Sequence, residues 1–309
     1  MNTTRPKSFS EFVGKDNVKN QLQTFIQASL LKKQQLTHTL FYGPPGVGKT
    51  SLAIILANTL NVKIKILQAP HIQKPSDLLN ALSIINKGDV LFIDEIHALP
   101  PNIMEILFPL MEDFSIDIVM GKEFNSKMTR MKLPTFTLVG ATTQFGRILN
   151  PLEERFGIVV HLDYYEFAEI KKIVEKHLTA LNLKMNEKEV DCLVSCCRYT
   201  PRTAIRLVER LADYKLINKN ISIDEILQQL QIYDLGLNQQ DINYLKVLAA
   251  NVNTPLGAKS ISLITGIDIM TLETKLEPFL LKIQLIRKTA RGRVIDQKGI
   301  AYLKSHHFI

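Results

Sequence analysis

Apolar positions in the first half of the chain fall into short runs separated by longer stretches with helical spacing. These runs lie between about residues 15 and 160 and include Thr39–Tyr42, Val90–Ile93 and Phe136–Val139. Short apolar runs without alternation are typical of strands buried on both faces, and strands that alternate with helices favour a parallel sheet. We therefore expect an α/β unit with crossover helices between buried parallel strands.

The pattern changes after this unit. Between about residues 166 and 235, apolar residues recur three and four apart, as in Ile170–Leu181 and Thr203–Tyr214, which predicts a small helical domain. After Asn238 the chain predicts short helices, followed by the runs Leu285–Lys288 and Arg293–Ile295 on either side of a turn. Helices followed by a small basic hairpin favour a winged-helix module of the helix-turn-helix class.

Length and cysteine content fit this division. At 309 residues the chain exceeds the usual size of one domain, and we expect three domains at residues 1–164, 165–236 and 237–309. The three cysteines, Cys192, Cys196 and Cys197, crowd one segment, and an odd number argues against a secreted disulfide framework. Cys192 and Cys196 fall four apart on a predicted helix, so we expect these two thiols to be buried as small apolar groups rather than to bind a metal.

Targeting signals and charge narrow the class of protein. The first residues carry no apolar signal region, and no run of about eighteen apolar residues occurs, so we expect a cytoplasmic protein that is neither exported nor inserted in a membrane. The formal net charge is +8, from 38 Lys and Arg against 30 Asp and Glu, which favours a polyanionic partner. Many basic proteins bind nothing anionic, so charge alone leaves nucleic-acid binding open.

A phosphate-binding loop is the strongest chemical signal. GPPGVGKT, residues 43–50, matches the P-loop pattern at every fixed position, after an apolar run and before the helical stretch Ser51–Leu60. Backbone N–H groups would surround the phosphates, Lys49 would place a charge at the β- and γ-phosphates, and Thr50 would ligate Mg²⁺. The predicted nucleotide contacts in this segment are Gly46, Gly48, Lys49, Thr50 and Ser51. A glycine-rich turn that merely precedes a helix is the alternative.

Two carboxylates end the apolar run that follows some forty residues later. In DVLFIDE, residues 89–95, Asp94 and Glu95 stand where a Walker B pair belongs. Asp94 would hold Mg²⁺ and Glu95 would polarise the attacking water, since phosphoryl transfer depends on positioning and charge stabilisation. Taken alone, the segment also fits a strand that ends in a solvated acidic turn. We assign His97, just beyond, a packing or hydrogen-bonding role and no chemistry.

Seven segments, in the same order along the chain, resemble the RuvB family of AAA+ ATPases. They are Arg5-Pro6 with Phe12-Val13-Gly14, GPPGVGKT, Asp94–His97, Gly140–Thr143, PLEERFG at residues 151–157, Thr200–Arg202 and Ala290–Arg293. The resemblance spans nearly the whole chain. It implies a P-loop AAA+ core with a helical lid and a winged helix, in a homohexamer that uses ATP to move duplex DNA at four-way Holliday junctions in recombination and repair.

The resemblance also implies roles for single residues. Thr142 and Thr143 would form the sensor-one region, Arg155 would be an arginine finger that reaches a neighbouring subunit, and Arg202 would be the sensor-two arginine. Adenine would lie against Thr4 and Arg5, Tyr165 and Pro201. The implied catalytic residues are Lys49, Asp94, Glu95, Thr142, Thr143, Arg155 and Arg202, and the further nucleotide contacts are Thr4, Arg5, Glu112, Asp113, Phe114, Arg155, Tyr165, Pro201 and Arg202.

Two residues depart from the family pattern. Gln144 stands where the family usually has the arginine of GATTR, and Glu153 stands where it has the first arginine of PLRxRFG. The first change removes a positive charge near the expected subunit boundary and the second reverses one. Arg155 survives both changes, so the implied chemistry is intact, whereas the family's interface contacts do not transfer unmodified.

A hairpin is predicted between the Walker B and sensor-one strands. Within Met111–Leu133, apolar Ile116, Ile118 and Met120 alternate with other residues, and Gly121–Asn125 predicts a turn. The family's hairpin at this place docks on RuvA, so the resemblance implies RuvA as a partner through residues 111–133, with a RuvC-like resolvase as a further candidate. The same alternation also describes an ordinary half-buried hairpin.

The C-terminal hairpin carries the implied DNA contacts. Lys288, Arg291 and Arg293 would neutralise phosphates without reading bases, as a motor that moves along any sequence requires. Basic residues in a terminal hairpin are otherwise simply solvated. Two rival functions are a clamp-loader or replication-initiator ATPase, which would lack the ARGR segment, and a non-catalytic nucleotide switch, which could dispense with Glu95.

Overall fold

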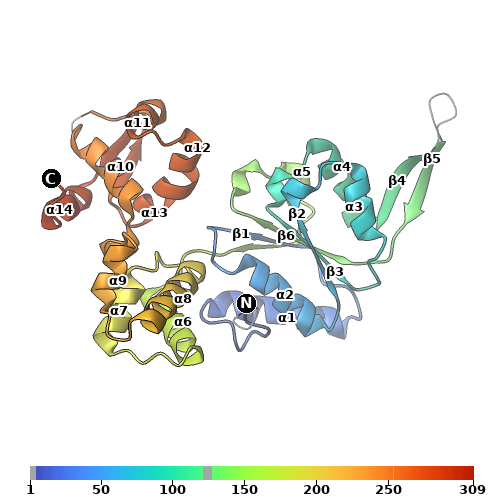
Figure 1. Cartoon of the computed structure of the whole chain (residues 1–309). Helices are drawn as coiled ribbons and strands as arrows, with labels where there is room; N and C mark the ends of the chain where they lie inside the picture. Colours follow the sequence, from blue (N-terminus) through green and yellow to red (C-terminus); the bar gives the residue numbers. More distant parts are fainter. Residues whose placement is uncertain (1–4, 121–126, 253) are drawn as a thin grey trace. The chain divides into compact units, whose positions relative to one another are not determined.

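The chain forms two compact units, each described separately below. The computed structural model describes residues 5–120, 127–252 and 254–309. One unit comprises Met1–Ile173 with Thr200–Arg202, and the other comprises Val174–Tyr199 with Thr203–Ile309 (Figure 1). Within these described ranges, no helix combines the length and apolar character that a membrane crossing requires.

The first unit is built on a five-stranded parallel sheet with strand order β2-β3-β6-β1-β7. Its strands are β1 Thr39–Tyr42, β2 Ile64–Gln68, β3 Val90–Asp94, β6 Thr137–Thr142 and β7 Ile158–His161. The whole of β6 is buried, and β1 and β3 are buried except at their last residues, as expected for parallel strands covered on both faces. The prediction of buried parallel strands is confirmed.

Helices α1 and α2 cover one face of this sheet, and α3, α4 and α5 lie on the other (Figure 1). The helical segments are α1 Asp16–Leu31, α2 Lys49–Leu60, η1 Ala69–His71, α3 Pro75–Leu82, η2 Ile96–Ala98, α4 Pro101–Glu112, η4 Phe145–Arg147 and α5 Asn150–Glu153. On the α4 face, Leu91 and Leu138 of the sheet share a buried cluster with Leu107 and Leu110 of α4. Each such side chain contributes about 1.5–3 kcal/mol on burial, which holds the sheet and its strand ends in place.

The predicted hairpin between β3 and β6 is confirmed as an antiparallel pair. Strands β4 Ser115–Met120 and β5 Lys127–Lys132 pair from Ser115 opposite Lys132 to Met120 opposite Lys127. The start of the predicted span, residues 111–112, is the end of α4, so the strands begin later than the sequence suggested. The predicted turn at 121–125 lies outside the described residues.

Helices follow the sheet, as the 166–235 pattern predicted. They are α6 Phe167–Ala180, α7 Glu187–Ser195, α8 Pro201–Ile217, α9 Ile223–Gln229 and the short η5 Asp234–Gly236. Cys196, just after α7, is buried as predicted, whereas Cys192 is only half-buried. The neighbouring Cys197 is also buried. All three thiols are free.

The C-terminal part of the second unit has the predicted order of helices and a hairpin. Its elements are α10 Gln239–Ala249, α11 Ala258–Thr265, α12 Ile269–Thr271, the π-helical turn η6 Leu272–Leu276, α13 Glu277–Lys282, β8 Ile286–Thr289, β9 Gly292–Ile295 and α14 Gln297–Ser305. Leu245 of α10, Ile261 of α11 and Phe279 of α13 pack with Ile286 and Ile295 of the hairpin in one core. This core fixes β8 and β9, which we call the wing, against the helices.

Candidate functional site

The predicted ATP-site residues follow three neighbouring strands of the first unit. Strand β6 lies between β1 and β3, with Tyr42 opposite Thr142 and Ile93 opposite Gly140. The P-loop, the two Walker B carboxylates and the sensor-one threonines therefore leave the sheet at the same carboxyl edge. Ligands of open parallel sheets bind at this edge.

The P-loop runs from the end of β1 to the start of α2 in a conformation that requires glycine. The N–H of Gly43 donates to the carbonyl of Thr142 over 3.2 Å, and its φ is +142°. A Cβ on Gly43 would lie 1.9 Å from the carbonyl oxygen of Leu162, and a Cβ on Gly46 would lie 2.8 Å from the Cβ of Arg202. The backbone of Leu162 and the side chain of Arg202 therefore occupy the space that side chains at Gly43 and Gly46 would need, so only glycine fits at these two positions.

Lys49 is buried at the first position of α2. Its Nζ donates to the carbonyl oxygens of Gly43 and Pro44 over 2.7 and 2.9 Å. Burial lowers the pKa of Lys49 to about 8, while the nearby charges of Glu95 and Asp94 act in the opposite direction. The ammonium thus lies among neutral carbonyls, close to both carboxylates, where a phosphate oxygen can become its partner.

The two Walker B carboxylates have different surroundings. Asp94 accepts hydrogen bonds from the N–H of Glu95 at 3.1 Å and from the side-chain amide of Gln68 on β2 at 3.3 Å. Glu95 has a positive φ of +52°, and its Oε2 accepts from the N–H and the hydroxyl of Thr143 at 3.0 and 2.9 Å. Glu95 and the sensor-one threonine predicted from the sequence are therefore in direct contact.

His97 joins this cluster, although the sequence gave it no chemistry. Its Nδ1 lies 3.3 Å from the Oε2 of Glu95 and 2.9 Å from the hydroxyl of Thr142. Burial lowers the pKa of His97 below its ordinary value, so a neutral imidazole faces the carboxylate. The one sequence signal for this contact is the position of His97, two residues after Glu95 in the short turn η2.

Aromatic and proline residues surround the other side of the P-loop. The hydroxyl of Tyr165 donates to the carbonyl of Val47 over 3.1 Å, and the N–H of Arg202 donates to the carbonyl of Gly46 over 3.3 Å. Pro201 is the first residue of α8, so this helix begins at the loop. Phe12 also lies here, with its ring edge 2.9 Å from the Cβ position of Gly48, and the sequence assigned it no contact.

Of the two N-terminal adenine contacts that the resemblance implies, only Arg5 lies among the described residues. Arg5 is exposed, and Thr4 lies outside the described residues. Thr50 and Ser51, half-buried, occupy the first turn of α2 behind Lys49, where the helix N-terminus favours an anion.

Arg155 forms a second cluster with α4. Its Nη2 lies 2.9 Å from Glu112, its guanidinium stacks 4.6 Å from the ring centroid of Phe108, and its Nη1 donates to the carbonyl of Pro151. The two residues after Glu112 have other partners. Asp113 pairs with Arg130 of β5 at 2.6 Å, and Phe114 packs edge-on to Phe136 with ring centroids 5.7 Å apart. Arg155 and Glu112, both among the predicted nucleotide contacts, thus lie together.

The implied DNA contacts of the wing differ in exposure. Arg291 is exposed in the two-residue turn between β8 and β9. The side chain of Lys288 is 47% exposed and pairs with Glu277, whereas that of Arg293 is 13% exposed and pairs with Glu277 and Glu273. The sequence did not indicate these acidic partners.

The sheet order and the site define the class of the protein. A P-loop after β1, a carboxylate pair after β3, threonines after the strand between them, and a helical segment that begins at the loop make this a nucleotide-binding P-loop ATPase of the AAA+ class. Three family models match along the chain. They are the Holliday junction DNA helicase RuvB P-loop domain at residues 4–162, the RuvB AAA lid domain at 165–238 and the RuvB C-terminal winged helix domain at 234–304. The chain belongs to the RuvB family.

Individual relatives agree with this assignment. The chain is 50% identical to the Holliday junction branch migration complex subunit RuvB of Mycoplasma genitalium over 298 residues, covering 96% of this chain and 97% of the relative. It is 49% identical to the Mycoplasma pneumoniae subunit of the same name, with 97% of both chains covered. The solved structure of the Thermotoga maritima RuvB Holliday junction branch migration motor is similar with a TM-score of 0.85 at 34% identity, covering 97% of this chain and 98% of that one.

Proposed function

We propose that this chain is the ATP-hydrolysing subunit of a cytoplasmic, homohexameric motor that drives branch migration of Holliday junctions together with RuvA in recombination and repair. Its ATPase core would span residues 1–164, its lid 165–236 and its winged helix 237–309. The observation that carries the proposal is the contact of Glu95 with Thr143 at the sheet edge where Lys49 is buried. The names of the full-length relatives supply the DNA substrate.

ATP binding rests on the P-loop and the residues around it. Lys49 would exchange its carbonyl partners for oxygens of the β- and γ-phosphates, and the loop's N–H groups would hold the others. Tyr165 and Pro201, with Thr4 and Arg5, would enclose the adenine, and Arg202 would reach the phosphates from the start of α8. The direct contacts of Tyr165 and Arg202 with the loop support these roles.

Thr50 of α2 and Asp94 at the end of β3 fit a Mg²⁺ ion. The hydroxyl of Thr50 and the carboxylate of Asp94 are the hard oxygen ligands that Mg²⁺ prefers, and few protein ligands are needed because the ion keeps water and phosphate oxygens. The electrostatic effect of Asp94 on Lys49 supports its closeness to the P-loop. When bound, the ion would offset charge on the phosphates.

Hydrolysis requires a carboxylate aimed at water. Glu95 would accept a proton from the attacking water, and the two donors of Thr143 would fix the carboxylate in the correct direction. His97 and Thr142 extend this network by a second layer of hydrogen bonds. Arg155, with Glu112, Asp113 and Phe114 close by, would act on the site of the next subunit in the ring.

The proposal assigns two further surfaces. The β4–β5 hairpin would bind RuvA, and the wing would contact duplex DNA through Lys288, Arg291 and Arg293. The positive charge of these three side chains, on an exposed hairpin of a winged helix, supports the second role. A RuvC-like resolvase would act on the same junction.

A synthetic four-way junction tests the whole proposal. With ATP, Mg²⁺ and RuvA, the purified chain is expected to dissociate the junction into duplexes, and Glu95→Gln is expected to bind ATP but to leave the junction intact. RuvA alone, and the chain alone, are the matched controls. A protein that binds nucleotide yet neither releases phosphate nor moves the junction under these conditions would contradict the proposal.

A further inference from the structure

A fully buried carboxylate lies at the base of the wing. Glu277, at the start of α13, has no exposed surface. Its Oε1 accepts from the hydroxyl of Tyr244 at 3.2 Å and from the Nε of Arg293 at 2.8 Å. Its Oε2 accepts from the Nζ of Lys288 at 2.8 Å and from the Nη2 of Arg293 at 3.2 Å. Donors from α10, β8 and β9 therefore meet on one side chain.

The charged state of Glu277 depends on these donors. Burial works against its ionisation, but the hydrogen bonds and charges of Arg293 and Lys288 outweigh burial, so the pKa of Glu277 lies below its usual value. A buried ion pair adds little net stability compared with apolar packing, because desolvation offsets the attraction. Removing one partner is costly, however, since the others are left buried and unpaired. The network therefore specifies geometry more than it adds stability.

The same network fixes the base of the wing. Lys288 and Arg293 are opposite each other in the β8–β9 pair, and Arg293 also exchanges both backbone hydrogen bonds with Leu256 at 2.8 and 3.0 Å. A second acid, Glu273, binds the Nη2 of Arg293 at 2.7 Å but is exposed. Arg293 is thus held on its side chain and on its main chain, and the two-residue turn that carries Arg291 projects from this fixed base.

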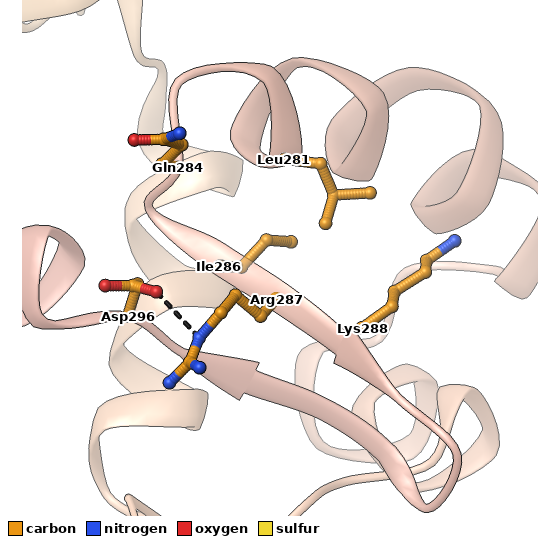
Figure 2. Close-up of a pocket in the computed structure, with 6 residues that line it drawn as sticks. All are labelled: Leu281, Gln284, Ile286, Arg287, Lys288 and Asp296. Atoms are coloured by element: carbon orange, nitrogen blue, oxygen red, sulfur yellow. Dashed lines mark ion pairs between the residues drawn. The ribbon is translucent and has the colours of Figure 1, made fainter.

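The side chains of β8 point in opposite directions from this base. In Figure 2, Lys288 points away from Arg287, which turns toward Asp296. Arg287 pairs with Asp296 over 2.7 Å, while Lys288 stays half-exposed although it is bound to Glu277. An ammonium group has three donors, so Lys288 can hold Glu277 and a phosphate oxygen at once.

We propose that Glu277 is a positioning residue for DNA binding, whose buried carboxylate fixes Lys288 and Arg293 so that the wing presents Lys288 and Arg291 to successive phosphates. The inference rests on the proposed function, in which the wing contacts duplex DNA. An acid beneath a phosphate-binding surface should weaken binding by charge alone. Positioning and charge therefore predict opposite signs when the acid is neutralised.

Glu277→Gln in the full-length chain separates these two effects. The amide replaces one acceptor oxygen with a donor that faces Lys288 or Arg293, so the wing loses its fixed geometry although the protein gains one positive charge. We expect duplex affinity, measured by fluorescence anisotropy across a salt series, to fall about eightfold at 0.1 M salt. The slope of log K against log salt should become shallower by about 0.9, the effect of one lost phosphate contact.

Glu273→Gln is the matched control. It adds the same charge beside the same arginine but leaves Glu277 in place, so its duplex affinity should equal or exceed that of the wild type. If Glu277→Gln binds duplex as tightly as the wild type or more tightly, in step with Glu273→Gln, charge alone governs the surface and the inference is wrong.

Two further variants cover a failure to fold and a failure of the proposed function. Should thermal unfolding show that Glu277→Gln does not fold, Glu277→Asp keeps the charge but withdraws the carboxylate by one methylene. Weaker binding by this variant supports positioning, and wild-type binding overturns it. Arg291→Ala tests the surface itself. If Arg291→Ala leaves duplex affinity and salt slope unchanged, both the proposed DNA contact of the wing and the positioning role of Glu277 are wrong. If Arg291→Ala weakens binding but Glu277→Gln binds tightly, only the positioning role of Glu277 is wrong.

Discussion

Lys49 of the P-loop and Lys288 of the wing are both held by oxygens of their own chain, but the oxygens differ in kind. Lys49 donates to two neutral carbonyls, those of Gly43 and Pro44. Lys288 donates to the carboxylate of Glu277. The carbonyls do not neutralise the charge of Lys49, so this charge is available to a triphosphate. The carboxylate of Glu277 neutralises the charge of Lys288 and fixes the position of its ammonium group.

This difference suits the two ligands. A nucleotide site must bind one small anion tightly and act on it, so concentrated positive charge inside a backbone cradle is effective. A DNA surface on a motor must hold phosphates at a set spacing and release them. We infer that the ATP site recognises phosphate mainly by charge and the wing mainly by geometry.

Removal of Lys49 is expected to have the largest effect on ATP binding. Lys49→Ala deletes a charged donor, and charged hydrogen bonds contribute about 1.5–3 kcal/mol each, so two phosphate contacts correspond to a loss of ATP affinity of about a hundredfold or more. Binding of a fluorescent ATP analogue measures it. Lys219→Ala, which changes an exposed lysine of the second unit, is the control and should bind ATP normally. Undiminished ATP affinity in Lys49→Ala would show that the charge of Lys49 does not bind the triphosphate, and the contrast with Lys288 would then be wrong.

Mixed rings test whether Arg155 serves the neighbouring site. Arg155→Ala and Glu95→Gln should each reduce hydrolysis strongly, because arginine fingers contribute about 10³- to 10⁵-fold in other nucleotide hydrolases. In rings assembled from equal amounts of both variants, about a quarter of the interfaces combine an intact Glu95 with an intact Arg155 of the next subunit. Phosphate release should therefore recover in the mixture. Assembled rings without recovery would show that Arg155 does not act in trans.

His97 contacts the proposed catalytic carboxylate of Glu95 in the ATP site, as Glu277 contacts Lys288 in the wing. Each is therefore a candidate for positioning its neighbour. His97→Ala removes a hydrogen-bonding neighbour of Glu95 and Thr142, and a misaligned catalytic group costs up to about a hundredfold in rate. We expect kcat to fall by about ten- to a hundredfold while ATP affinity stays within about twofold, since Lys49 is unchanged. His97→Asn places an amide nitrogen near the position of Nδ1 and should restore much of the rate. Equal loss in both variants would argue for a packing role instead.

The sequence predicted the ATP site more completely than the wing, for a physical reason. The P-loop and the Asp94–Glu95 pair are each made of residues that are adjacent in sequence. Each follows a strand of the parallel sheet, so both lie at the carboxyl edge of that sheet. The same locality predicted the strands, the helical region and the terminal hairpin. The strand order, with β6 between β1 and β3, depends on long-range packing, and no short pattern records it.

Long-range contacts also explain what the sequence did not indicate. His97 meets Thr142 across 45 positions, and Glu277 meets Arg293 across 16, from a helix to a strand. Each partner alone is an ordinary polar residue in the sequence. The family resemblance implies the wing's basic residues as DNA contacts, but tertiary structure decides which of them is exposed and which is held by a buried acid. The roles assigned to single site residues and the domain boundaries stay predictions.

The pKa of Lys49 provides the smallest and most specific test of the comparison. Burial lowers this pKa to about 8, so near pH 8 about half of the protein carries a neutral Lys49 before nucleotide binds. A triphosphate beside the amine favours the charged form and raises the pKa, so binding must take up a proton. The contribution of Lys49 to ATP affinity is therefore fully present well below pH 8 and is lost as pH rises through it.

Calorimetry in buffers of different ionisation enthalpy measures that proton. At pH 8.5 the binding heat should change with the buffer, with uptake of more than about half a proton per nucleotide, and near pH 6.5 Lys49 should contribute almost none. ADP is the control that separates the γ-phosphate, because a ligand with less negative charge should raise the pKa less and take up a smaller fraction. If the heat at pH 8.5 does not depend on the buffer, Lys49 is already fully charged before ATP arrives. The contrast between a lysine held by carbonyls and one held by a carboxylate would then have no consequence for binding.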